Sequence, residues 1–297
     1  MNKTTHINRF RLWCQIAFAA LTNGYVTGFV KGDIFKGPSK GLCVPGLGCH
    51  SCPGALFACP VGALQAVLGS RGYHFSLYVF GILGVFGTLF GRFICGWLCP
   101  FGLVQDLLGK IPVPFKRKTL PGHKILSYLK YLVLLILVIL LPMFVRSAMG
   151  QGEPWFCAYL CPSGTLFAGI PLLALKGDLR GFIGGTFFWK LGVLIAVLIL
   201  STAVNRPFCQ YLCPLGALYG LFNPIAFYRY KVEEHCVDCG ACQKACPFDI
   251  DVSQTPNSAA CIRCGACQKA CPAGAITSTF DAFKKNITSS KPIDPNE

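Results

Sequence analysis

Charge is scarce in this sequence, and negative charge most of all. Only 13% of the 297 residues are charged, and 12 acidic residues stand against 27 basic ones, which gives a formal net charge of +15. Hydrophobic residues make up 53% of the chain. A soluble domain carries far more charge than this, so the composition predicts a membrane protein.

Several functional signals are also missing. Cys49-His-Ser-Cys52 is followed by Pro53, so it is not a haem-attachment motif, which needs His at that position. No cleavable signal peptide is evident, so the first apolar run is expected to stay as a span. Few polar residues interrupt the apolar runs, which disfavours a transporter. The basic residues cluster in short loops beside these runs, as orientation in a membrane requires, so no nucleic-acid partner is predicted.

Four apolar runs are long enough to be predicted as membrane-spanning helices. They cover residues 12–30, 75–94, 126–145 and 182–204. The apolar stretch 166–175 is too short to span and is expected to lie at the membrane interface or to re-enter. Basic residues concentrate in the first 11 residues and in the 110–124 loop. The positive-inside rule places both, and the chain after the fourth span, in the cytoplasm. We therefore expect a multi-pass protein of the cytoplasmic (inner) membrane.

Cysteine is abundant, and 19 cysteines, an odd number, exclude a fully paired disulfide framework. One short pattern recurs, with two cysteines four positions apart, then Pro, then Gly two residues later. It occupies residues 95–102, 157–164 and 209–216, and a looser copy occupies 52–62. In this pattern Pro stops a helix after the second cysteine, and Gly permits a tight turn around its sulfur. The repetition indicates one structural solution used several times.

A [4Fe–4S] cluster needs four thiolates, so two of these pairs must meet. The copies after the second and fourth predicted spans emerge on the same face, which predicts one set of ligands: Cys95, Cys99, Cys209 and Cys213. The copies on the opposite face predict a second set: Cys52, Cys59, Cys157 and Cys161. Cys43 and Cys49 are then left over. A rival outer set is Cys43, Cys49, Cys52 and Cys59. Repeated units at both ends would give an inverted pseudo-symmetry about the bilayer midplane.

From residue 230 the sequence becomes polar and rich in cysteine. Two runs share the spacing Cys-x2-Cys-x2-Cys-x3-Cys-Pro, and they start at Cys236 and Cys261. This is the two-cluster run of bacterial ferredoxins, in which the fourth cysteine of each run binds the other cluster. One cluster is therefore assigned Cys236, Cys239, Cys242 and Cys271, and the other Cys261, Cys264, Cys267 and Cys246. Zinc sites do not need two interleaved quartets that end in Cys-Pro.

These patterns together predict the fold class and the domains. Residues 1–228 are expected to form a membrane α-helical domain with four spans and the Cys-x3-Cys-Pro repeats. Residues 229–281 are expected to form an α+β domain of the bacterial 2[4Fe–4S] ferredoxin type, and residues 282–297 a disordered tail. Two clusters are expected in the ferredoxin domain and one or two more in the membrane domain. No catalytic acid or base is predicted.

The stretch Cys95-Gly-Trp-Leu-Cys-Pro-Phe-Gly102, a second Cys-x3-Cys-Pro at 209–214 and the double ferredoxin run give the chain a family resemblance. It resembles the NapH-type membrane-bound ferredoxins, which are linked to quinol dehydrogenases. The resemblance implies [4Fe–4S] clusters held by Cys95, Cys99, Cys209, Cys213 and the eight ferredoxin cysteines. It also implies a membrane electron carrier, or a quinol-dehydrogenase-like oxidoreductase subunit, that works with quinone or with a redox partner protein. The outer cysteines suggest a flavin or haem protein as that partner.

The outer cysteines depart from that family's pattern and suggest a continuous chain of clusters through the bilayer. They are Cys43, Cys49, Cys52, Cys59, Cys157 and Cys161. We expect electrons to pass between a cytoplasmic ferredoxin domain and a quinone or an extracytoplasmic redox partner. The alternative is a redox sensor or a metalloenzyme maturation factor that uses the same clusters, although no DNA-binding or sensor domain is recognisable.

Overall fold

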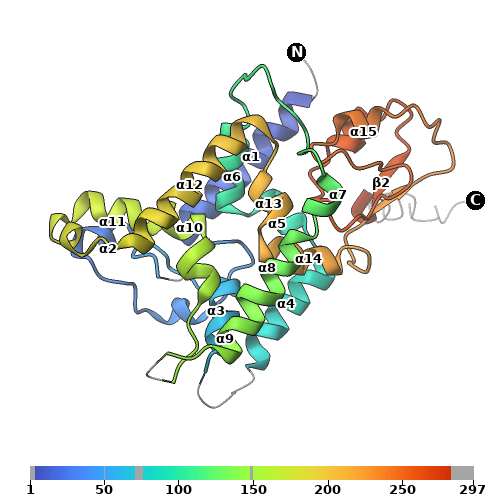
Figure 1. The fold of residues 1–297 in the computed structure, drawn as a ribbon. Helices are drawn as coiled ribbons and strands as arrows, with labels where there is room; N and C mark the ends of the chain where they lie inside the picture. Colours follow the sequence, from blue (N-terminus) through green and yellow to red (C-terminus); the bar gives the residue numbers. More distant parts are fainter. Residues whose placement is uncertain (1–3, 50, 71–75, 148–149, 282–297) are drawn as a thin grey trace, which may run out of the picture.

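The computed structural model describes residues 4–49, 51–70, 76–147 and 150–281 and is mostly helical (Figure 1). The predicted tail, residues 282–297, lies outside the described residues. The α-helices are α1 Thr4–Thr22, α2 Thr27–Lys31, α3 Pro60–Leu68, α4 Leu77–Phe90, α5 Phe93–Trp97, α6 Pro100–Leu108, α7 His123–Leu126, α8 Leu129–Val133, α9 Leu141–Phe144, α10 Pro162–Gly164, α11 Ile170–Leu175, α12 Gly185–Ala203, α13 Pro207–Tyr211, α14 Pro214–Phe222, α15 Ala241–Ala245 and α16 Ala266–Ala270. Short 3-10 helices form at Pro38–Gly41 and Gly177–Phe182, and π-helical turns at Leu134–Leu140, Phe156–Leu160 and Thr165–Gly169.

Two helices within the described ranges are long and apolar enough to cross a membrane. One is His123–Phe144, which joins α7, α8 and α9, and the other is α12. Only 28% and 17% of their apolar windows are buried, so most of their apolar surface faces outward. The core helix of a soluble protein would be mostly buried instead. These two helices match the predicted spans 126–145 and 182–204.

The prediction of four spans is wrong for the first two apolar runs. The run 12–30 is split between α1 and α2, because Thr22 and Asn23 turn their side chains back onto the Ala19 carbonyl oxygen and end the helix. The run 75–94 yields the 14-residue helix α4, which ends before Gly91. Gly91 has a φ of 53°, which a helix cannot continue. Only residues 12–22 of α1 belong to the apolar run, because its first half is polar and basic, and α4 has 14 residues, so both apolar segments are shorter than a full span.

The cysteine repeats fold as one local unit. The second cysteine of each repeat caps a helix that begins with the following Pro, at α3, α6, α10 and α14. Pro is well suited to the first helical position, where no N–H has an intrahelical partner. Two residues later, the Gly102 N–H points to Cys99 Sγ at 3.4 Å, and Gly216 makes the same contact with Cys213. The sequence pattern thus codes for a helix start that surrounds a sulfur atom with backbone donors.

The repeats gather at opposite ends of α12. Near its first turns, Lys190 Nζ donates to the Cys157 carbonyl oxygen at 3.1 Å. At its last residue, the Ala203 carbonyl oxygen accepts from Arg117 N, and the turn that follows leads into Cys209 in α13. Figure 1 shows α10 and α13 near the two ends of this helix. The repeats therefore form two groups, one near each end of α12.

Near the C-terminus, β1 (Tyr230–Val232) pairs antiparallel with β2 (Ile276–Ser278), in the register Tyr230↔Ser278, and the two strands with the segment between them form a small unit. The helices α15 and α16, which lie between the two strands in sequence, pack against each other, and α16 contacts β2. The unit rests on α5, where Trp97 Nε1 donates to the Arg263 carbonyl oxygen at 3.0 Å. The Asn223 side chain also donates to the Cys261 carbonyl oxygen at 2.7 Å. The second cysteine run therefore sits directly against the helical part of the chain.

Candidate metal centres

Cys95, Cys99, Cys209 and Cys213 line one small cavity, which we call the inner site. The first two come from α5 and the turn into α6, and the other two from α13 and the turn into α14. All four are buried. Burial and then the charge of Cys99 raise the pKa of Cys209 to about 11. A metal centre that bound all four thiolates would compensate this cost and displace their protons.

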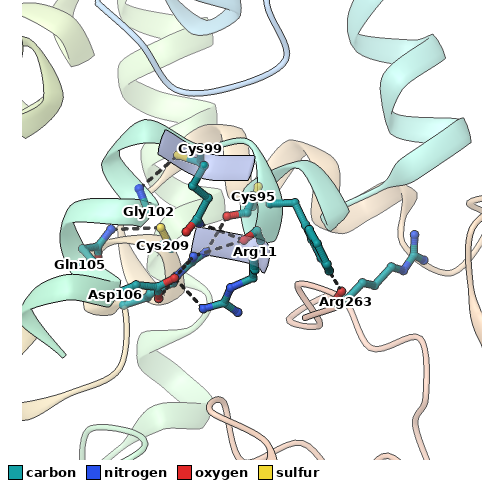
Figure 2. A network of polar contacts seen from close by, with 12 residues as sticks. Arg11, Cys95, Cys99, Gly102, Gln105, Asp106, Cys209 and Arg263 are labelled. Atoms are coloured by element: carbon teal, nitrogen blue, oxygen red, sulfur yellow. Dashed lines mark hydrogen bonds and ion pairs between the residues drawn. The ribbon is translucent and has the colours of Figure 1, made fainter. Parts of the chain in front are cut away.

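A glutamine fixes the inner site from one side. Gln105 Nε2 donates to Cys209 Sγ at 3.2 Å, as Figure 2 shows. The other end of the same amide, Oε1, accepts from Phe208 N at 3.2 Å. Gln105 is 1% exposed, so both contacts are shielded from water. The amide therefore holds the α13 cysteine in place and directs a donor at its sulfur.

Buried cations surround the inner site. Arg92 is 0% exposed and Lys130 is 3% exposed, and neither takes part in an ion pair among the described residues. Arg92 donates to the Cys209 carbonyl oxygen at 2.9 Å, while its Nε has no partner in the described structure. A buried cation is costly unless an anion lies nearby. A [4Fe–4S] cluster with four thiolates carries about −2 when oxidised, which fits this surplus of positive charge.

A third buried cation, Arg206, has its own carboxylate. Its guanidinium donates to both carboxylate oxygens of Asp106, at 2.7 and 2.6 Å, and to the Cys95 carbonyl oxygen at 2.5 Å. Arg11 also donates to Asp106, at 2.6 Å (Figure 2). Burial alone would raise the pKa of Asp106, but the charge and hydrogen bonds of Arg206, together with the charge of Arg11, outweigh burial and hold that pKa below its usual value. This network ties α1, α6 and α13 together around the Cys95 turn.

A second and larger cavity, of about 600 Å³, is lined by Cys49, Cys59, Cys157 and Cys161. We call it the outer site. Three of its cysteines belong to the predicted outer set, but Cys52 does not line it. The Cys52 thiol instead donates to the Phe167 carbonyl oxygen at 3.3 Å. Cys43, which the rival set includes, is buried and forms an isolated β-bridge with Ala58. It does not line the cavity either.

The C-terminal cysteines group as two interleaved sets. Cys236, Cys239, Cys242 and Cys271 line one small cavity, so the last cysteine of the second run joins the first run. In the other set, the charges of Cys261, Cys264 and Cys246 add to burial in raising the pKa of Cys267. Cys246 therefore lies beside the second run. These are the groupings that the spacing predicts for a two-cluster ferredoxin.

Within the described residues, no three His, Cys, Asp or Glu side chains converge closely enough to hold a single metal ion. This is expected for cubane sites, because each thiolate of a [4Fe–4S] cluster binds a different iron. The chemistry of the donor sets, four cysteines each with backbone N–H groups directed at sulfur, therefore fits [4Fe–4S] clusters rather than a mononuclear site.

Sequence reasoning missed the paired glutamines and the place of Cys49. The glutamine signal is present in the sequence, since Cys-Pro-x-Gly-x-x-Gln occurs at 59–65 and again at 99–105. The glutamine stands six positions after the cysteine in both copies, which places the amide about two helical turns along the new helix. Cys49 had no comparable signal, because it stands in an irregular loop outside the repeats.

Comparison with known proteins agrees with these centres. Residues 72–119, 131–176 and 186–229 match one family described as a 4Fe-4S binding domain, and residues 229–250 and 255–277 match a second family of that description. Two uncharacterised proteins of Methanocaldococcus jannaschii are each 32% identical to the chain. Their alignments cover 58% and 68% of this chain and 66% and 69% of their own length. No solved structure matches.

Relatives with a descriptive name are more distant. The putative electron transport protein YccM of Escherichia coli is 27% identical over 57% of this chain and 45% of its own length. The ferredoxin-type protein NapH of Haemophilus influenzae is 28% identical over 54% of this chain and 50% of its own length. The chain therefore spans about half the length of these named relatives. The cluster-binding domains and these relatives identify the chain as a [4Fe–4S] iron–sulfur electron-transfer protein that belongs to the NapH-type ferredoxin family.

Proposed function

We propose that this protein carries electrons across the cytoplasmic membrane, between its C-terminal ferredoxin unit and a quinone or an extracytoplasmic redox partner. The observation that carries this proposal is the contact between the second ferredoxin run and the inner site. Gly96, inside the Cys95–Cys99 turn, packs against the Ile262 carbonyl, and Ile262 stands between the ligand candidates Cys261 and Cys264. The backbone of Gly96 and the backbone of Ile262 are therefore in direct contact between the two sets of cysteines.

A second set of contacts supports an orientation of the protein in the membrane. The basic 110–124 loop lies on the ferredoxin side, because Lys118 donates to the Gln243 carbonyl oxygen at 2.9 Å and pairs with Asp249 at 3.3 Å. Loops rich in Lys and Arg stay in the cytoplasm. We therefore assign the ferredoxin unit and the inner site to the cytoplasmic side and the outer cavity to the other side. The helix His123–Phe144 and α12 would then cross the membrane, whereas α1 packs against α5 and α6, and α4 packs against α3 and α14.

The polypeptide supplies position, charge and insulation. When bound, each cluster supplies one-electron redox chemistry. Cys239 is exposed, so the first ferredoxin set is the side open to a soluble donor or acceptor. Arg92 and Lys130 supply buried positive charge beside the inner thiolates, which stabilises the more negative, reduced state. Phe101 and Phe208, both at most 1% exposed, pack edge to face beside the same cysteines and keep water out.

The test is electron transfer across a sealed bilayer. We would reconstitute the anaerobically purified protein into liposomes that enclose ferricyanide and add titanium(III) citrate outside. We expect ferricyanide bleaching with the wild-type chain and with Cys14→Ser, since Cys14 lies apart from every cysteine set. Bleaching should stop with Cys99→Ser. If liposomes with the fully loaded wild type bleach ferricyanide no faster than protein-free liposomes that enclose ferricyanide, the transmembrane role is wrong. A sensor or maturation role on one side then becomes the better explanation.

A further inference from the structure

The outer cavity repeats the construction of the inner site down to single hydrogen bonds. Gln65 Nε2 donates to Cys157 Sγ at 3.2 Å, as Gln105 does to Cys209. Gln65 Oε1 accepts from Phe156 N at 3.1 Å, as Gln105 accepts from Phe208 N. Both glutamines are 1% exposed. One protein unit, a Cys-Pro helix start with its glutamine and a Phe-Cys helix, therefore occurs twice, at opposite ends of α12.

The fourth cysteine comes from a different position in the two sites. In the inner site, Cys95 stands four residues before Cys99, whereas no cysteine stands four residues before Cys59. In the outer site, the fourth cysteine is Cys49, from the preceding loop. A Cβ built on Gly164, in the turn that follows Cys161, would lie 3.5 Å from Cys49 Sγ. The loop thus places the sulfur of Cys49 against the repeat at 157–164. The thiol of Cys52 instead donates to the Phe167 carbonyl oxygen.

One polar group in this wall lacks a partner. Thr165 lines the outer cavity and is 2% exposed, and its hydroxyl has no hydrogen-bond partner among the described residues. Buried hydroxyls are normally hydrogen-bonded, so the isolation of this one indicates a missing acceptor. Inorganic sulfide or thiolate sulfur in the cavity would provide one.

The two sites also share a wall. Leu47 is 1% exposed and lines both cavities. Burial raises the pKa of Cys99 and of Cys59; the backbone N–H of Leu47 opposes this rise at Cys99, and the next N–H, from Gly48, opposes it at Cys59. Consecutive amides thus reach a cysteine of each site. The outer cavity is therefore the immediate neighbour of the inner one.

We propose that Cys49, Cys59, Cys157 and Cys161 hold a further [4Fe–4S] cluster, and that Cys49 rather than Cys52 is its fourth ligand. Neither family match includes Cys49 or Cys59. The proposal extends the electron path of the proposed function by one step toward the far side. It stands independently of that function, because a cluster could occupy this cavity whether or not electrons leave the protein there.

The test compares two cysteines three residues apart. We would purify wild type, Cys49→Ser and Cys52→Ser anaerobically and measure iron and acid-labile sulfide per chain. With four clusters of four irons each, we expect roughly sixteen irons in wild type and in Cys52→Ser, and roughly twelve in Cys49→Ser. The EPR signals of the remaining clusters should persist in Cys49→Ser, which distinguishes loss of one site from misfolding.

A second variant leaves all thiols intact. Gln65→Ala removes one donor from Cys157 Sγ and should lower the midpoint potential of one cluster, while Gln105→Ala should lower that of a different cluster. The proposal is wrong if wild type holds only about twelve irons, if zinc replaces the iron, or if Cys52→Ser loses a cluster that Cys49→Ser keeps. Loss of transmembrane electron transfer with all sixteen irons present would overturn the proposed function and leave this site standing.

Discussion

Gly96 and Ile262 are in such close contact that a side chain at Gly96 would overlap the Ile262 carbonyl oxygen. This contact joins the inner site to the second ferredoxin run. Gly96→Ala should therefore push the two apart, destabilise the fold by about 1–3 kcal/mol and slow electron transfer between the two sets. Stopped-flow reduction followed by rapid-freeze EPR would measure that rate. Gly81→Ala is the control, since no atom lies within 4 Å of its added Cβ. An unchanged rate in Gly96→Ala would show that electrons do not use this contact.

Gln105 should set the potential of the inner cluster. Hydrogen bonds to cluster sulfur raise the potential, so Gln105→Ala should lower it. A loss of about 1.4 kcal/mol in preference for the reduced state corresponds to about 60 mV for one electron. A redox titration followed by EPR measures this shift, with the exposed Gln254→Ala as the control. A rise in potential, or equal shifts in both variants, would contradict the role given to the amide.

Arg92 should be needed to keep the inner cluster. Removing a buried cation from its anionic partner typically costs about 3–5 kcal/mol, because the remaining charge is left uncompensated. Arg92→Met should therefore lose roughly four irons per chain while the ferredoxin signals remain. The same substitution at the exposed Arg9 should change nothing. Full iron content in Arg92→Met would mean that the charge of Arg92 does not stabilise this centre.

Asp106 gives a pH-dependent prediction. Its pKa is lowered in the folded protein because the neighbouring Arg206 and Arg11 outweigh the effect of burial. A carboxylate of this kind stabilises the fold above its unfolded pKa of about 3.9, and that stabilisation disappears as the pH falls through the lower, folded pKa. Asp106→Asn should thus be less stable than wild type at pH 7 by roughly 3 kcal/mol. The difference should shrink below about pH 4.

Thermal unfolding in detergent at a series of pH values would follow this effect. Asp249→Asn is the matched control, because its pair with Lys118 is half exposed and should contribute less than about 1 kcal/mol. Curves for wild type and Asp106→Asn that stay equally far apart from pH 7 to pH 3 would contradict the assigned charge state.

The sequence by itself determined the local chemistry. The spacing of the two ferredoxin runs specifies loops that surround a cubane, because three cysteines within seven residues can reach only one small object. The Cys-x3-Cys-Pro-x-Gly repeats specify helix starts at α6, α10 and α14 for an equally local reason, since Pro and Gly act on their own backbone. The two longest apolar helices followed from their composition.

Only the tertiary structure decided which distant thiols share a cavity. Cys49 and Cys52 are three residues apart in an irregular loop, and their directions depend on contacts with Gly164 and Phe167 far along the chain. The lengths of α1 and α4 likewise depended on a polar helix end and on the backbone at Gly91, which hydropathy does not register. The twin roles of Gln65 and Gln105 emerge only when a second helix brings a cysteine within reach of each amide. Hydrophobic pattern and motif spacing act over a few residues, whereas the meeting of sulfur atoms depends on how whole helices pack.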